Sequence, residues 1–152
     1  MEKDRHLHPH MELTQKIIGA TMLVHRALGP GLDGKIYENA LCLELSVQKL
    51  EFTQQEHFPV YYRECLVGRL ITDLIAQNQV IIETKAVSAI NEFHVSQILS
   101  YLSITGLQVG LVFNFRTPSL TFKRVANIHF KRPQILPSVI RNPNIHQLPP
   151  RP

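Results

Sequence analysis

Three ionisable side chains, Asp73, Glu83 and Lys85, lie in two apolar runs of the chain that are separated by a short polar segment. The β-branched and aliphatic residues around them predict a hairpin of largely buried strands over about 66–76 and 80–87. A charged group in a buried strand requires a partner, a metal ion or a shifted pKa. This hairpin is therefore where the sequence points to chemistry.

The spacing of these residues predicts how they face one another. With 77–79 as a three-residue loop, Asp73 lies across from Glu83, with Cβ atoms about 4.5 to 5.5 Å apart. Glu83 and Lys85 share one face of their strand. Two such carboxylates repel each other unless a hard divalent cation lies between them, and Mg²⁺ also retains waters that can act as nucleophile. Lys85 would orient or help deprotonate that water and offset charge on a phosphoryl group. The set is typical of metal-assisted phosphodiester hydrolysis.

A simpler interpretation of the hairpin is structural. Glu83 and Lys85 can form an ion pair on one face, with Asp73 merely close to a turn. Many unrelated strands contain an Asp followed ten residues later by Glu-x-Lys. On the hairpin alone, the ion pair is the favoured interpretation.

Periodicity and punctuation predict the elements that must position these residues. In chain order they are a helix over 12–28, a helix over 33–49, a strand over 52–62, the hairpin, a helix over 91–105, and strands over 107–115 and 120–125. Asp33 and Asn91 are the expected N-caps, and Pro59 indicates an edge strand. The strand over 107–115 suits a right-handed crossover and parallel pairing, which makes the protein an α/β fold.

The second helix has an unusually wide apolar surface, which predicts contacts with both a sheet and a neighbouring helix. Its apolar residues are Ile36, Tyr37, Ala40, Leu41, Leu43, Leu45 and Val47.

Length and composition favour one compact domain. The chain has 152 residues, 44% hydrophobic and 18% charged, which suits one domain over 12–130. Residues 1–11 are expected to be a flexible terminus, and 131–152 a disordered, Pro-rich basic tail. The formal charge of +4 comes entirely from that tail, so bulk charge does not identify a partner for the folded part.

The sequence gives no sign of membrane association. No apolar run approaches the roughly 20 residues of a membrane span, and the first residues lack the apolar segment of a secretory signal. We therefore expect a cytoplasmic protein with no membrane partner.

A further set of polar residues lies on the helix over 91–105. Gln97 and Tyr101 are four residues apart and share a face, and His94 is one turn earlier on the same side. The spacing reads QxxxY. Together with the hairpin, this second polar group favours a functional site over a chance ion pair.

These motifs resemble, in order, those of the GxxExxY family, a branch of the PD-(D/E)XK nuclease superfamily. The resemblance covers roughly residues 13–127. It rests on Gly29-Pro30-Gly31 leading to Tyr37, the strand pair with Asp73 and Glu83-Thr84-Lys85, the helix from His94 to Tyr101, and the strand over 106–115.

The resemblance implies a restriction-endonuclease-like mixed β-sheet flanked by helices, in the order α-α-β-β-β-α-β-β. It implies that Asp73, Glu83 and the backbone carbonyl of Thr84 bind Mg²⁺, with Mn²⁺ as an alternative, and that Lys85 is the catalytic lysine. Gln97 and Tyr101 would lie at the edge of the site, as in the similar QxxxY motif of RecB-like nucleases. The implied partner is nucleic acid, either DNA or RNA, and symmetric cutting of both strands would require a homodimer.

The chain departs from the family pattern at Gly34, where the family name specifies Glu. The absent carboxylate could weaken metal binding or slow turnover. Glu38, one helical turn later, could partly replace it or could be a solvated or ion-paired residue. The alternative function is therefore a weakened or inactive nuclease fold that binds nucleic acid or protein. His25 and His94 are accessory candidates, although a lone histidine such as His25 on a half-buried face usually serves packing.

Overall fold

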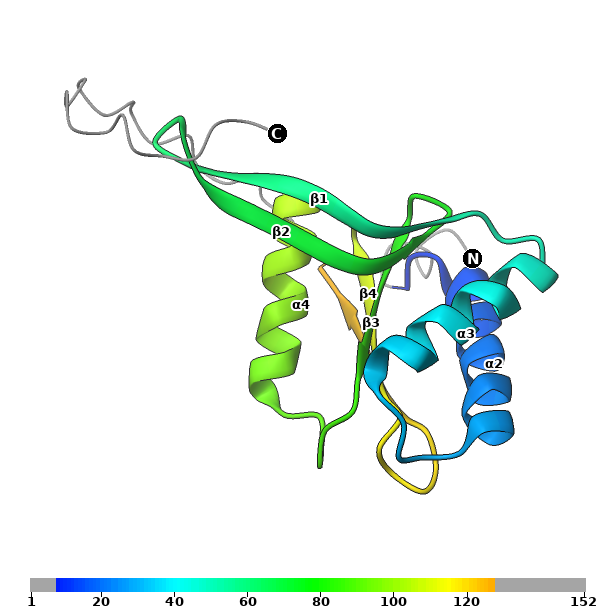
Figure 1. The fold of residues 1–152 in the computed structure, drawn as a ribbon. Helices are drawn as coiled ribbons and strands as arrows, with labels where there is room; N and C mark the ends of the chain where they lie inside the picture. The colour runs from blue at the N-terminus through cyan, green and yellow to red at the C-terminus, as the bar shows by residue number, and fades with distance from the viewer. Residues whose placement is uncertain (1–7, 128–152) are drawn as a thin grey trace.

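The computed structural model describes residues 8–127 and contains three helices and five strands (Figure 1). In order they are α2 (Met11–Leu28), α3 (Gly34–Val47), β1 (Phe52–Tyr62), β2 (Cys65–Ala76), β3 (Val80–Lys85), α4 (Glu92–Thr105), β4 (Val109–Asn114) and β5 (Thr121–Ala126). The strands form one sheet in the order β1-β2-β3-β4-β5. Only the β3–β4 pair is parallel, so the predicted element order and mixed α/β fold are confirmed.

The sheet separates two helical layers, with α2 and α3 on one face and α4 on the other (Figure 1). Side chains alternate along β3, so Ile82 belongs to the core beneath α2 and α3, whereas Ile81 packs with Ile98 and Leu102 of α4. Both faces of β3 are therefore buried, as the unbroken apolar run predicted.

The β1–β2 hairpin is longer than the rest of the sheet. β2 pairs with β1 along most of its length, but with β3 only through Leu74, Ile75 and Ala76. In Figure 1 the hairpin extends past α4 as a two-stranded ribbon. β2 consequently separates from β3 directly at Asp73.

Helix ends follow the local sequence, with one exception. Asn91 caps α4 by accepting from the backbone N–H of His94, and Gly106 ends the helix in a left-handed conformation with φ of 77°. Asp33 occupies the N-cap position of α3 but makes no hydrogen bond from its side chain. The expected aspartate cap is thus absent, and the helix also ends at Val47, two residues earlier than predicted.

The wide apolar surface predicted for α3 is only partly buried. Tyr37, Leu41 and Leu45 are fully buried, but Leu43 is 72% and Val47 is 73% exposed. An outer-layer helix contacts the sheet and α2 through one stripe, so side chains outside that stripe remain in solvent. The predicted contacts with both the sheet and a neighbouring helix are confirmed, whereas Ile36, Leu43 and Val47 of the apolar surface are exposed.

The ends of other elements also differ slightly from the predictions. β3 stops at Lys85 rather than at residue 87, because the side-chain amide of Asn114 replaces a backbone partner at Val87. The Asn114 side chain accepts from the N–H of Val87 at 3.1 Å and donates to the carbonyl of Val87 at 2.8 Å. The first helix begins at Met11, inside the segment expected to be flexible. Residues 1–7 and the predicted basic tail lie outside the described residues.

Within 8–127, no helix has the length and apolar character needed to span a membrane.

Candidate functional site

Asp73 and Glu83 lie where regular pairing between β2 and β3 ends. The last ladder pair is Leu74 with Ile82, and the same register continued by one residue sets Asp73 opposite Glu83. Here side chains replace the backbone ladder. The backbone N–H of Asp73 donates to Oε1 of Glu83 at 3.1 Å, and the backbone N–H of Thr84 donates to Oδ2 of Asp73 at 2.9 Å. The Thr84 hydroxyl adds a third bond to the same Oδ2 at 3.1 Å. Each carboxylate is thus fixed by the opposite strand.

The Glu83 carboxyl is buried, with only 4% of the residue exposed. Burial, followed by the negative charge of Asp73, raises the pKa of Glu83 from 4.5 to about 8. Burial also raises the pKa of Tyr101, and the charges of Glu83 and Asp73 add to that effect. The two carboxylates and the phenol therefore share one electrostatic environment, in which a second negative charge requires a compensating cation.

Lys85 does not form the ion pair of the simpler interpretation. Its ammonium group donates to Oε1 of Gln97 at 2.9 Å. The ion pairs within 4.0 Å among residues 8–127 are Lys16–Glu12 and Lys35–Glu38, so Lys85 and Glu83 are not paired. The structure therefore joins Lys85 to α4 through the Gln of the QxxxY motif.

The residues predicted on α4 lie along one side of that helix. Tyr101 is partly buried, against the core formed with Ile75 and Ile81. The Nδ1 atom of His94 accepts from the backbone N–H of Asn91 at 3.0 Å and completes the helix cap. His94 thus has a structural partner, whereas Gln97 faces Lys85.

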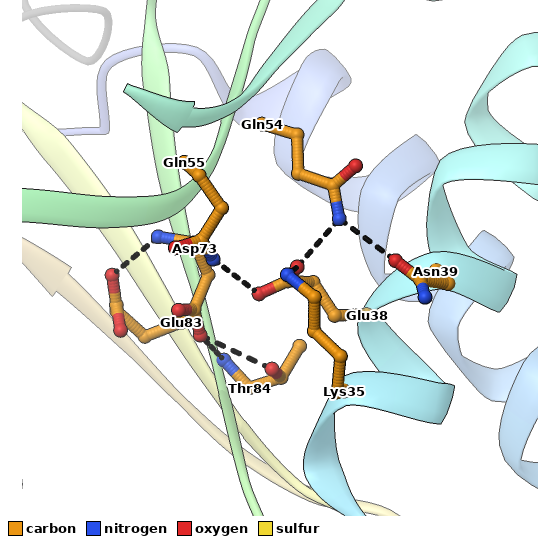
Figure 2. A network of polar contacts seen from close by, with 8 residues as sticks. All are labelled: Lys35, Glu38, Asn39, Gln54, Gln55, Asp73, Glu83 and Thr84. Carbon is orange, nitrogen blue, oxygen red and sulfur yellow. Dashed lines mark hydrogen bonds and ion pairs between the residues drawn. The ribbon is translucent and has the colours of Figure 1, made fainter. Parts of the chain in front are cut away.

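Glu38 lies at the centre of a polar network between α3 and β1 (Figure 2). The residue is 2% exposed. Its Oε2 accepts from Nζ of Lys35 and from Nε2 of Gln54, both at 2.5 Å, and its Oε1 accepts from Nε2 of Gln55 at 2.9 Å. The sequence suggested Glu38 but missed both glutamines. The one sequence signal for this network was the pair of neighbouring amide side chains, Gln54 and Gln55, in a strand predicted to be regular.

Gly34 is the first residue of α3, one turn before Glu38. A Cβ atom added at Gly34 would meet no other atom within 4 Å. The position where the family pattern has Glu therefore has room for a larger side chain.

The glycine-tyrosine motif has a structural role in this fold. The buried Tyr37 ring stacks on Phe115 at 4.3 Å between centroids, and its hydroxyl donates to the carbonyl of Gly29. The same hydroxyl accepts from the N–H of Leu32 at 3.1 Å. Tyr37 therefore fixes the loop that joins α2 to α3, in which Gly31 has a φ of 103°.

The His25 side chain contacts Thr117 and Phe115. The residue is 6% exposed, and its Nε2 lies 3.0 Å from the carbonyl of Thr117, which it can only approach as a donor. Its ring also contacts Phe115 at 6.0 Å between centroids. These contacts are those of a packing residue.

The arrangement offers two carboxylates, a nearby backbone carbonyl and an amine. Among residues 8–127 no three His, Cys, Asp or Glu side chains converge as a metal cluster. Mg²⁺ is commonly bound through one or two carboxylates with several waters retained, so Asp73, Glu83 and the carbonyl of Thr84 suit such an ion. The raised pKa of Glu83 fits this donor set, because a cation would compensate the charge that burial disfavours.

Comparison with known proteins bears on the superfamily. A sequence profile described as the PD-(D/E)XK nuclease superfamily matches residues 11–125. No curated protein and no solved structure matches the chain.

Proposed function

The chain belongs to the PD-(D/E)XK nuclease superfamily, and from that premise we propose that it is a Mg²⁺-dependent nuclease that hydrolyses phosphodiester bonds in nucleic acid. We also assign it to the GxxExxY branch, on the glycine-rich loop that Tyr37 fixes and on the QxxxY helix that contacts Lys85. The observation that carries the proposal is the position of Asp73 opposite Glu83 at the point where β2 leaves β3.

In this proposal Asp73, Glu83 and the backbone carbonyl of Thr84 hold the divalent ion, which is Mg²⁺ or, as an alternative, Mn²⁺. When bound, the ion supplies Lewis-acid polarisation of the phosphoryl group and a water of lowered pKa. The protein contributes the fixed orientation of both carboxylates, since each one is hydrogen-bonded to the opposite strand.

Lys85 is the residue proposed to act on the attacking water. Its side chain shares the face of Glu83 and is held at 2.9 Å by Gln97, so the ammonium is oriented before substrate binds. In that position it can orient the water, move a proton from it, and offset charge on the phosphoryl oxygens. Gln97 positions the lysine, and Tyr101 bounds the site on the α4 side.

A non-catalytic binding module is the second candidate, and Gly34 together with Glu38 favours it. Gly34 supplies no carboxylate, and both oxygens of Glu38 are already engaged by side-chain donors from Lys35 and β1. Glu38 therefore does not take the place of the absent family glutamate as a free ligand.

A cleavage assay separates the two candidates. Single- and double-stranded DNA and RNA are incubated with folded protein in Mg²⁺, in Mn²⁺ and in EDTA. Metal-dependent cleavage that disappears in Asp73→Ala and Lys85→Ala, with unchanged circular dichroism, supports the nuclease. No cleavage of any substrate by folded protein supports the binding module, and full activity in either variant refutes the site assignment.

A further inference from the structure

Two neighbouring residues of β1 reach the same carboxylate. Gln54 and Gln55 both direct their side-chain amides to Glu38 of α3 (Figure 2). Successive residues of a regular strand point to opposite faces of a sheet. Both amides can meet one carboxylate only if the backbone between them departs from strand geometry.

That departure is at Gln55, which has a φ of 55°. This is the left-handed region, which residues with a Cβ atom rarely adopt. The β1–β2 register contains Gln54 with Leu74 and Glu56 with Thr72, but it has no pair for Gln55. Residues persist in such conformations when their surroundings over-determine them, and they concentrate at functional sites.

The residue that stands opposite Gln55 in this register is Asp73. On its other side, the β2–β3 ladder ends one residue earlier, at Leu74. Asp73 therefore has no ladder partner in either neighbouring strand. Its carboxylate instead accepts both bonds from Thr84.

The contacts of Glu38 show what maintains this local geometry. Its carboxylate is buried, its charge is compensated by Lys35, and both of its oxygens are occupied by side-chain donors. In the described part of the chain, Glu38 does not converge with two other His, Cys, Asp or Glu side chains as a metal cluster would require. Glu38 thus acts as an anchor for β1 and not as a ligand.

We propose that Gln55 is a positioning residue for the site. The contact of Gln54, Gln55 and Glu38, here called the glutamine clamp, holds the left-handed backbone at Gln55. That backbone keeps Asp73 out of regular pairing and leaves its carboxylate facing Glu83. The inference rests on the proposed function in one respect, because it takes Asp73 and Glu83 as the metal ligands.

Substitution of Gln55 by Ala and by Gly tests this directly. Both changes remove the hydrogen bond from Gln55 to Glu38, but Gly adopts the left-handed backbone freely whereas Ala favours the extended strand. In metal-free protein, Gln55→Ala should speed hydrogen exchange of the Asp73 and Thr84 amides about tenfold or more. The reason is that the Asp73 amide donates to the Glu83 carboxylate and the Thr84 amide donates to the Asp73 carboxylate. Gln55→Gly should stay within about threefold of wild type. Dissociation constants for Mn²⁺, measured by calorimetry, should follow the same order, with about tenfold weaker binding in Gln55→Ala.

The matched control is Gln77→Ala. Gln77 lies in the β2–β3 turn with a φ of 53° and makes no side-chain hydrogen bond within residues 8–127. Its replacement should leave the exchange of Asp73 and Thr84 unchanged. Unchanged exchange in Gln55→Ala would overturn the inference, and so would equal acceleration in the Ala and Gly variants, because the side chain would then not act through the backbone. Failure of the wild-type protein to bind Mn²⁺ would refute the proposed function, while the exchange data would still decide the role of Gln55.

Discussion

Replacement of Glu83 by Gln should remove a large pH dependence of folding stability. The folded protein raises the pKa of this carboxyl from 4.5 to about 8, through burial first and the charge of Asp73 second. Below pH 4.5 the group is protonated in both the folded and the unfolded chain, so it contributes no difference. Between 4.5 and about 8 the unfolded chain releases the proton while the folded chain retains it. The free energy of unfolding therefore falls as the pH rises through this window.

The magnitude follows from the two pKa values. Each pH unit in the window corresponds to about 1.4 kcal/mol, so the whole displacement is at most about 5 kcal/mol. Gln has nearly the same volume and no charge, and this contribution is absent from the variant. The difference in unfolding free energy between Glu83→Gln and wild type should thus grow by several kcal/mol from pH 4.5 to about 8.

Urea unfolding in EDTA at a series of pH values measures this difference. Comparison with the variant is essential, because every ionisable group other than residue 83 is common to both proteins, so its contribution cancels in the difference. Saturating Mn²⁺ should raise the free energy of unfolding of the wild-type protein above pH 7, since the ion favours the ionised carboxylates. At a Mn²⁺ concentration a hundred times the dissociation constant, the increase should be about 2.7 kcal/mol. Parallel stability curves for the two proteins in EDTA would refute the assignment of the buried proton to Glu83.

Three further substitutions test other parts of the structure. Gly34→Glu should tighten Mn²⁺ binding relative to the matched Gly34→Ala, because the position has open space for the carboxylate that the family pattern specifies. Calorimetry showing equal affinities would mean that α3 does not reach the metal. Tyr37→Phe should lower the free energy of unfolding by about 1 to 3 kcal/mol in urea titrations, because it leaves the half-buried carbonyl of Gly29 without its donor. A loss below a few tenths of a kcal/mol would show that water replaces the hydroxyl. Gly110→Ala should destabilise the protein by about 1 to 3 kcal/mol in the same assay, since the new Cβ would lie 2.5 Å from Cγ2 of Ile98 in the closely packed core of β4 and α4; unchanged stability would mean that Ile98 has another rotamer available.

The sequence alone determined most of the elements and the strand residues of the candidate site. Short segments of the chain specify these features through their own sterics and hydrogen bonding. Examples are the alternation and composition of the strands, the Asn91 cap and the Gly106 stop. The ten-residue interval between Asp73 and Glu83 fixed their register once the turn was recognised, because strand period and loop length leave little freedom.

Only the tertiary structure decided which side chains meet across the layers. Lys85 contacts Gln97 rather than Glu83, although the shared strand face allowed either partner. Glu38 is buried against two glutamines of β1, which no local period indicates. Contacts of this kind depend on how α3 and α4 pack against the sheet, and packing joins segments whose separation in the chain carries no periodic signal. The left-handed backbone of Gln55 follows from the same cause, since it is held by an acceptor 17 residues away.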